Sequence, residues 1–211
     1  MIAAELLLSA RDLVHLRVTD AYSVHRVVYS LFEDVRSDEQ KVKSEHSGFL
    51  YVDKGMLRDG SRRIILLSDR APVTPEFGTL RCITVSEKFL AFSDYRFAVV
   101  ANATKRKALP RPSDNSKTKG PIVPITGRDE LVRWFREKSP VFWGFETTHV
   151  EVGAVTVARI QKKNTVIPLQ QVEFTGTLHV TDREKFLQTF KTGIGRGKAF
   201  GCGLLQLSPL N

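Results

Sequence analysis

A helix predicted over residues 21–32 separates side chains that could do acid–base chemistry from side chains that belong in a core. With successive residues ~100° apart, one face gathers two phenols, an imidazole and a guanidinium, at Tyr22, His25, Arg26 and Tyr29. The opposite face is aliphatic, with Val24, Val27, Val28 and Leu31. Histidine is the side chain whose ordinary pKa lies nearest neutrality, so His25 could accept or donate a proton. Tyr22 precedes it by three residues, which makes the two side chains neighbours and lets the phenol orient a hydroxyl group.

The alternative interpretation of these four residues is an exposed helix face of ordinary polar character. A core position is not expected for His25, because it lies away from the aliphatic stripe. The other histidines do not have the spacing of metal ligands, so we expect no bound metal. They are His15, His46, His149 and His179.

A glycine-rich loop near the end of the sequence could receive phosphate. Its eleven residues, 193–203, include five glycines and two cations, Arg196 and Lys198. The glycines, which let another backbone come close, are Gly193, Gly195, Gly197, Gly201 and Gly203.

Neither nucleotide-binding motif fits this loop. A dinucleotide fingerprint stands between a strand and a helix, whereas here a helix comes before the glycines and a strand after them. A Walker loop needs Ser or Thr after its lysine, and Lys198 is followed by Ala199. We therefore expect no nucleotide cofactor and favour an extended polyanion as the ligand. The alternative is a close-packed turn without a ligand.

The chain is basic, since 32 of its 211 residues are Lys or Arg and 23 are Asp or Glu, which gives a formal net charge of +9. Such a charge favours polyanions such as RNA or DNA. Six cations lie within residues 104–120, among them Lys105, Arg106, Lys107 and Arg111. We expect this stretch to be an exposed, mobile basic linker, the alternative being a solvated loop without a partner.

The composition also bears on the compartment. Cys82 and Cys202, the two cysteines, lie far apart and form no metal-spaced pair, which argues against a disulfide framework and fits the reducing cytoplasm. No stretch approaches the ~18–20 apolar residues of a membrane span, and the N-terminus lacks the basic region of a signal peptide. We expect a cytoplasmic protein that does not engage a membrane.

The predicted elements indicate an α+β fold. Apolar or alternating runs predict strands at residues 3–8, 48–52, 62–68, 95–102, 146–160, 166–180 and 203–207. Further helices are predicted over 128–138 and, capped by Asp182, over 183–192. This order suggests two tandem ferredoxin-like (RRM-like, βαββαβ) domains, at residues 1–103 and 121–211, joined by the linker 104–120. Residues 72–92, broken by Pro72, Pro75 and Gly78, would then have to supply the second helix of the first domain.

Four stretches, in order along the chain, resemble the CRISPR repeat-processing endoribonucleases of the CasE branch, which belongs to the RAMP superfamily. They are residues 20–28 with Tyr22-x-x-His25, residues 97–106, residues 172–180, and the glycine-rich loop with residues 204–210. The resemblance covers nearly the whole chain and is weakest at residues 53–92.

This resemblance implies two tandem ferredoxin-like folds and cleavage within a CRISPR repeat hairpin without a metal or other cofactor. Tyr22 and His25 match the catalytic tyrosine and histidine of the family, and Arg26 and Tyr29 are candidates for catalytic support. The family lays the basic tip of a β-hairpin into the groove of the RNA stem, and that tip corresponds to Arg159, Lys162 and Lys163.

The implied partners are the repeat stem-loop and the other subunits of the type I-E Cascade complex. The cations of the linker, the hairpin and the glycine-rich loop are therefore expected to bind RNA. The alternative is a non-catalytic RNA-binding subunit of the same superfamily, which would need the fold and the charge but not the Tyr–His face.

Overall fold

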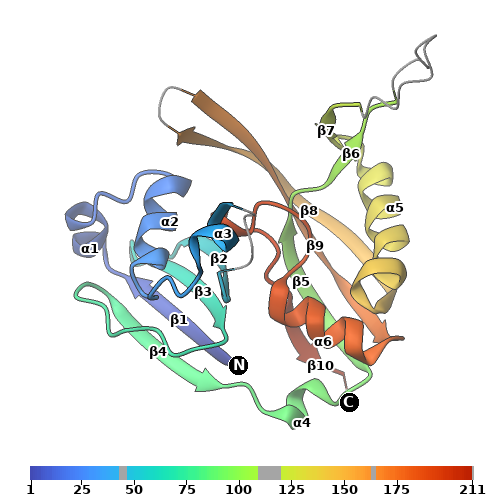
Figure 1. Ribbon diagram of the computed structural model, residues 1–211, viewed down its shortest axis with the longest axis horizontal. Helices are drawn as coiled ribbons and strands as arrows, with labels where there is room; N and C mark the ends of the chain where they lie inside the picture. Colours follow the sequence, from blue (N-terminus) through green and yellow to red (C-terminus); the bar gives the residue numbers. More distant parts are fainter. Residues whose placement is uncertain (43–46, 109–119, 163–164, 211) are drawn as a thin grey trace.

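The computed structural model describes residues 1–42, 47–108, 120–162 and 165–210. These residues form two four-stranded antiparallel sheets that lie beside each other, with helices packed on them (Figure 1). In each sheet the first strand of the unit lies between its fourth and its third, which is the order of a ferredoxin-like βαββαβ unit. The predicted α+β class and the tandem ferredoxin-like fold are confirmed.

The first unit has the strand order β2-β3-β1-β4. Its strands are β1 (Ile2–Leu8), β2 (Phe49–Met56), β3 (Arg62–Ser68) and β4 (Thr79–Thr84). Its helices are α1 (Ala10–His15), α2 (Ala21–Tyr29), α3 (Asp38–Val42) and α4 (Glu87–Leu90). Because alternate strand residues share a face, Leu6 and Leu8 of β1 point together into a core that Val24 and Val28 of α2 complete.

The second unit has the strand order β10-β5-β9-β8. Its strands are β5 (Asp94–Ala101), β8 (Phe145–Lys162), β9 (Thr165–Val180) and β10 (Gln206–Pro209), and a small hairpin pairs β6 (Thr104–Arg106) with β7 (Ile122–Pro124). Helices α5 (Arg128–Lys138) and α6 (Arg183–Thr192) cover one face of the sheet, and a π-helical turn follows α5 at Ser139–Trp143. Aromatic rings fill this core, with Phe135 of α5 in contact with Phe97 and Phe174.

The sheet topology corrects the predicted division of the chain. The strand predicted at 95–102 is β5, which pairs with β9 and opens the second unit, so the units meet between β4 and β5 and not at residues 104–120. β4 closes the first sheet in its place, and the described residues between β3 and β4 contain no helix. Alternation marks a strand but does not say which sheet it joins. Only the packing of its inward face against α5 and α6 decides that.

The basic stretch 104–120 therefore lies within the second unit. Its first residues form β6, which is hydrogen-bonded to β7, and are not the mobile linker that the charge run predicted. Residues 109–119, with Arg111, lie outside the described part of the chain.

Helix α2 begins where predicted and ends one turn earlier. Asp20 caps it, because its carboxylate accepts from the Ser23 amide at 2.8 Å while the Ser23 hydroxyl accepts from the Asp20 amide at 2.9 Å. The predicted last turn leaves the helix, and Leu31 and Phe32 become core residues, with the Phe32 ring stacked on Phe49 at 4.2 Å between centroids.

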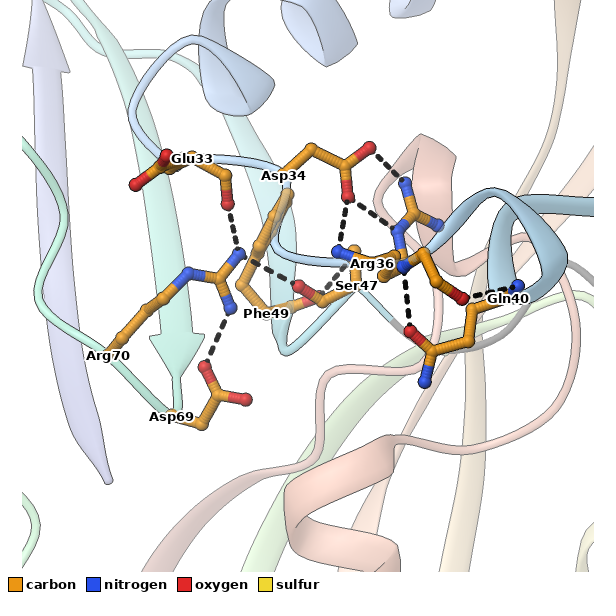
Figure 2. A network of polar contacts seen from close by, with 9 residues as sticks. Glu33, Asp34, Arg36, Gln40, Ser47, Phe49, Asp69 and Arg70 are labelled. Atoms are coloured by element: carbon orange, nitrogen blue, oxygen red, sulfur yellow. Dashed lines mark hydrogen bonds and ion pairs between the residues drawn. The ribbon is translucent and has the colours of Figure 1, made fainter.

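Arg70 holds the chain where it leaves α2 and where it enters β2 (Figure 2). Its guanidinium donates to the carbonyl oxygens of Glu33 at 2.7 Å and Ser47 at 3.1 Å, and it pairs with Asp69 at 2.9 Å. The same group lies 5.6 Å from the centre of the Phe32 ring. These contacts fix the C-terminal end of α2 relative to the sheet beneath it.

The two units share an apolar interface. Leu50, Val52 and Leu67 point away from α2 and pack against Phe190 of α6 and Leu204 of the second unit. This interface sets the position of the glycine-rich loop, which lies between α6 and β10, relative to the first unit.

Candidate active site and nucleic-acid interface

His25 lies where α2 of the first unit meets the glycine-rich loop of the second. Its Nδ1 is 2.7 Å from the carbonyl oxygen of Ala199. A carbonyl oxygen can only accept a hydrogen bond, so Nδ1 carries the hydrogen. In the neutral ring Nε2 is then unprotonated and free to accept a proton.

Aromatic rings surround this imidazole. Tyr29 lies 4.0 Å from it between ring centroids, Phe200 lies 5.1 Å away, and Tyr22 stacks beside it at 5.8 Å. Burial among these rings lowers the pKa of His25 from its ordinary value, and the bond to Ala199 offsets part of the shift by favouring the charged form. The neutral imidazole therefore predominates at pH 7.

The other members of the predicted face take different positions. Tyr22 is exposed at 41% beside His25. Tyr29 is half-buried, with its ring edge against Phe49 at 4.7 Å, so it links the imidazole to the core. Arg26 is exposed, and among the described residues its side chain makes no hydrogen bond or ion pair, which leaves its charge available to a ligand.

Tyr51 is a member of the site that the sequence did not single out. It lies on β2 with only 2% of its surface exposed, and its hydroxyl donates to the same Ala199 oxygen at 3.0 Å. Burial raises the pKa of Tyr51 well above its ordinary value, so this hydroxyl stays protonated. The only signal in the sequence was a phenol in an otherwise apolar strand, since a buried Tyr hydroxyl usually finds a partner.

The glycine-rich loop presents Ala199 on a 3-10 turn, Lys198–Phe200, with a glycine on each side. Gly197 and Gly201 both have left-handed backbone angles, with φ of 80° and 81°, which residues with side chains adopt at a cost. A Cβ at Gly201 would also lie 3.3 Å from the Tyr51 ring. These features are typical of a close-packed turn, which was the alternative interpretation of this loop in the sequence.

The two cations of the loop differ in exposure. Lys198 is half-buried beside Ala199, and burial lowers its pKa from the ordinary value. Arg196 is exposed, and its backbone pairs with Asn102 at the end of β5. The middle of the loop thus contacts the His25 site through Ala199 and the β5–β6 edge through Arg196.

A second group of predicted RNA-binding residues lies at that edge. A groove of about 750 Å³ between α5 and the β6–β7 hairpin brings Lys105 and Arg106 together with Arg196. Lys105 pairs with Glu130 across it. The rest of its charged and aromatic lining comes from α5, as Arg133, Trp134, Glu137 and Lys138. Lys107, also predicted to bind RNA, is exposed just after β6.

The long β8–β9 hairpin extends beyond its sheet on the side of α2 (Figure 1). Thr156 and Ala158 line a cavity of about 290 Å³ beside the start of α2, so alternation turns the exposed Arg159 to the opposite face. That face also carries Gln170, whose amide donates to the Ile125 carbonyl at 2.8 Å. The structure does not bring Arg159 onto the α2-facing side of the hairpin. Lys163 lies outside the described residues, and only the backbone of Lys162 is described.

The cavity beneath the hairpin is poorly suited to phosphate. Its charged lining consists of the carboxylates of Asp20, Asp53 and Glu173 and the guanidinium of Arg62, which is already paired with Asp53. Tyr22 and Arg26, by contrast, are exposed neighbours of His25 on α2.

Two further features concern the described residues as a set. No three of their His, Cys, Asp or Glu side chains come together in a group that could hold a metal ion. None of their helices is long and apolar enough to cross a membrane.

Comparison with known families shows which protein family the chain belongs to. A sequence profile of the family described as "CRISPR associated protein" matches residues 4–209. The chain belongs to the CRISPR-associated protein family. The resemblance drawn from the sequence motifs is thereby confirmed.

Individual relatives agree with this placement. The CRISPR-associated endoribonuclease Cse3 of Thermus thermophilus is 32% identical over 125 residues, which are 54% of this CRISPR-associated protein and 55% of Cse3. The matched segment thus spans about half the length of this curated relative.

Two solved structures share the fold over the whole chain. Cas6e from Escherichia coli K-12 superimposes with a TM-score of 0.72 at 20% identity, over 100% of each chain. Thermus thermophilus Cse3 bound to an RNA representing a pre-cleavage complex gives a TM-score of 0.71 at 20% identity, over 99% of this chain and 98% of that one.

Proposed function

We propose that this protein is an endoribonuclease that binds the repeat stem-loop of precursor CRISPR RNA and cleaves it to give mature guide RNA. The observation that carries the proposal is the His25 imidazole, whose Nδ1 is tied to the Ala199 carbonyl while Nε2 remains basic beside the exposed Tyr22. A non-catalytic RNA-binding subunit would not need this arrangement. Membership of the CRISPR-associated family and the likeness to the endoribonuclease Cse3 support the choice of RNA.

The arrangement suits attack by the substrate's own ribose. His25 Nε2 takes the proton of the 2′-OH, and the 2′-oxygen forms a bond to the adjacent phosphorus. The bond from phosphorus to the 5′-oxygen of the next nucleotide breaks, and that oxygen takes a proton from solvent water and leaves as a 5′-OH. A 2′,3′-cyclic phosphate remains. Because RNA supplies the nucleophile and His25 the base, we propose that the reaction needs no metal.

Neighbouring groups would assist each stage. Tyr22 can orient the attacking or leaving oxygen, since its ring stacks on that of His25. Charge that develops on the phosphate would be stabilised by Lys198, which adjoins Ala199, and by Arg26, which follows His25. Tyr29 keeps the imidazole in place from the core side.

We propose that the second unit and its basic edge hold the RNA. The groove with Lys105, Arg106 and Arg196 continues from the glycine-rich loop, and together with Lys107 it offers cations for the RNA backbone. Arg159 would meet the A-form stem from the distal hairpin, where phosphates and 2′-OH groups are read by shape. As partners we propose the other Cascade subunits, on the resemblance to the CasE branch, and as location the cytoplasm, where the free Cys82 and Cys202 would stay reduced.

The proposal is tested with a labelled RNA of the repeat stem-loop, incubated in EDTA with the wild type or with His25→Ala. The wild type should cut once and leave a 2′,3′-cyclic phosphate and a 5′-OH, identified by end-group analysis. His25→Ala should bind RNA normally and cleave ~10²–10⁴-fold more slowly, because general base catalysis is lost.

Four outcomes would count against this function. Wild-type cleavage by His25→Ala would remove the catalytic assignment. Full activity on RNA with a 2′-deoxyribose at the cut site would exclude internal attack. Tight binding by the wild type without any cleavage would favour a non-catalytic subunit, and inhibition by EDTA would point to a metal-dependent reaction.

A further inference from the structure

We infer that Tyr51 is a positioning residue for His25 and that it acts through the Ala199 carbonyl, which both side chains use as their acceptor. The inference rests on the proposed function, since it concerns the same imidazole. It adds a residue that lies on a different element from the Tyr22-x-x-His25 helix and outside the glycine-rich loop.

Three elements meet at the Ala199 oxygen. His25 reaches it from α2 at 2.7 Å, Tyr51 reaches it from β2 at 3.0 Å, and the oxygen itself belongs to the 3-10 turn of the loop. A carbonyl oxygen has two lone pairs, so it accommodates both donors. Two side chains of the first unit therefore donate hydrogen bonds to one carbonyl oxygen of the second unit.

Of the three groups that meet here, the His25 ring, the Tyr51 hydroxyl and the Ala199 carbonyl, Tyr51 is held most rigidly. Its ring is buried in the core of the first unit, and Gly201 packs against the ring edge, so the hydroxyl has little room to turn elsewhere. No other polar partner of this hydroxyl occurs in the described chain. The hydroxyl donates here, because burial raises the pKa of Tyr51 well above its ordinary value and a carbonyl oxygen can only accept.

The turn, in contrast, is held weakly by its own backbone. Two hydrogen bonds close it, both to the Gly197 carbonyl, from Phe200 at 2.9 Å and from Cys202 at 3.3 Å. It is flanked by Gly197 and Gly201, whose backbones have wide conformational freedom. Gln171 also donates to the neighbouring Phe200 carbonyl at 3.0 Å. Among the described residues, His25 and Tyr51 are the side chains that donate to the Ala199 carbonyl itself, so without the Tyr51 hydroxyl this carbonyl would keep only the His25 bond.

This orientation decides which imidazole nitrogen is basic. While the carbonyl points at Nδ1, the neutral ring keeps its hydrogen there and offers Nε2 as the base. If the carbonyl turns away, the hydrogen can move to Nε2, and the ring then presents no base to the 2′-OH. The bond to Ala199 also raises the pKa of His25, so its weakening lowers that pKa further.

The charged and titratable groups around His25 leave this interpretation intact. They are Tyr22, Arg26 and Tyr29 on α2, Lys198 on the turn, and Tyr51 on β2. None of them is a carboxylate that could fix the imidazole in place of Ala199, and burial and the Ala199 bond are the causes of the shift in its pKa.

The test compares Tyr51→Phe with Tyr95→Phe, which removes a similar bond elsewhere. Tyr95 is buried in the second unit, and its hydroxyl donates to the Phe89 carbonyl at 2.7 Å. Each variant thus loses one hydrogen bond from a buried phenol to a backbone carbonyl. Three quantities are measured: the single-turnover cleavage rate at saturating enzyme, the Kd for uncleavable 2′-deoxy repeat RNA, and the His25 tautomer and pKa by nitrogen-15 NMR of the free protein.

For Tyr51→Phe we expect cleavage to slow by about 3- to 10-fold, the range for loss of one hydrogen bond, with an unchanged Kd. We expect the Nε2–H tautomer of His25 to become detectable and the pKa of His25 to fall. Tyr95→Phe should match the wild type in all three.

Equal cleavage rates in the two variants, or a wild-type His25 tautomer in Tyr51→Phe, would overturn the inference. The NMR measurement needs no RNA. If His25→Ala proved as active as the wild type, the proposed function would fail, and the tautomer would still show whether Tyr51 positions the imidazole.

Discussion

At the scale of single residues, the environment of His25 fits a base better than an acid. Its Nδ1 is committed to Ala199, and burial among Tyr22, Tyr29 and Phe200 disfavours the imidazolium. A general acid would need the charged form at neutral pH, which this site opposes. The sequence had left both roles open.

This environment predicts the pH dependence of cleavage. Because the folded-state pKa of His25 lies below its ordinary value of 6.5, the neutral base predominates above pH 6.5 and is lost as the pH falls through the lower pKa. Single-turnover rates measured from about pH 4.5 to about pH 8 should therefore fall on the acid side with a midpoint below 6.5. His25→Ala should lack this limb, and a rate that rises on acidification would instead make His25 the acid.

At the scale of elements, the glycine-rich loop matters through its shape. Its five glycines all have positive φ, and the turn between Gly197 and Gly201 carries the carbonyl that holds His25. The loop therefore contributes to the geometry of the proposed catalytic site, in addition to any contact of Arg196 and Lys198 with RNA.

A comparison of Gly201→Ala with Gly195→Ala should separate the effect of crowding the Tyr51 ring from the effect of backbone strain. Both positions have left-handed φ, so each variant should lose ~1–2 kcal/mol of stability, measured by denaturant unfolding. A Cβ at Gly195 meets nothing within 4 Å, whereas one at Gly201 crowds the Tyr51 ring. We expect only Gly201→Ala to cleave more slowly at unchanged Kd, and equal rates in the two variants would detach the turn from catalysis.

At the scale of the whole molecule, the site exists only because the two units are docked. His25 and Tyr51 belong to the first unit and Ala199 to the second. Phe190 of α6 packs on Leu50 and Val52 at the interface, while Phe186 of the same helix packs inside the second unit.

These two phenylalanines allow the docking to be tested. Phe190→Ala and Phe186→Ala should each destabilise the protein by about 3–5 kcal/mol, as buried Phe-to-Ala changes do, measured by thermal or denaturant unfolding. At a temperature where both variants remain folded, Phe190→Ala should also cleave more slowly, because the Ala199 carbonyl shifts relative to His25. A greater loss of rate in Phe186→Ala would contradict the role of the interface.

Local pattern predicted most elements but not their partners. The helix predicted at 128–138 and the strand at 62–68 agree with α5 and β3 residue for residue. Two predictions were wrong, the end of α2 and the sheet that β5 joins, because Phe32 packs on Phe49 and β5 pairs with β9. Those contacts join residues distant in sequence, so no local period records them.

The sequence by itself determined that Tyr22 and His25 share one face of a capped helix, because helical periodicity and the Asp20 cap act within a few residues. Tertiary structure alone decided which nitrogen of His25 is basic. The Ala199 carbonyl lies 174 residues from His25 and 148 from Tyr51. Alternation could place Tyr51 on the inner face of a strand, but the partner of its hydroxyl depends on how two separately folded sheets dock.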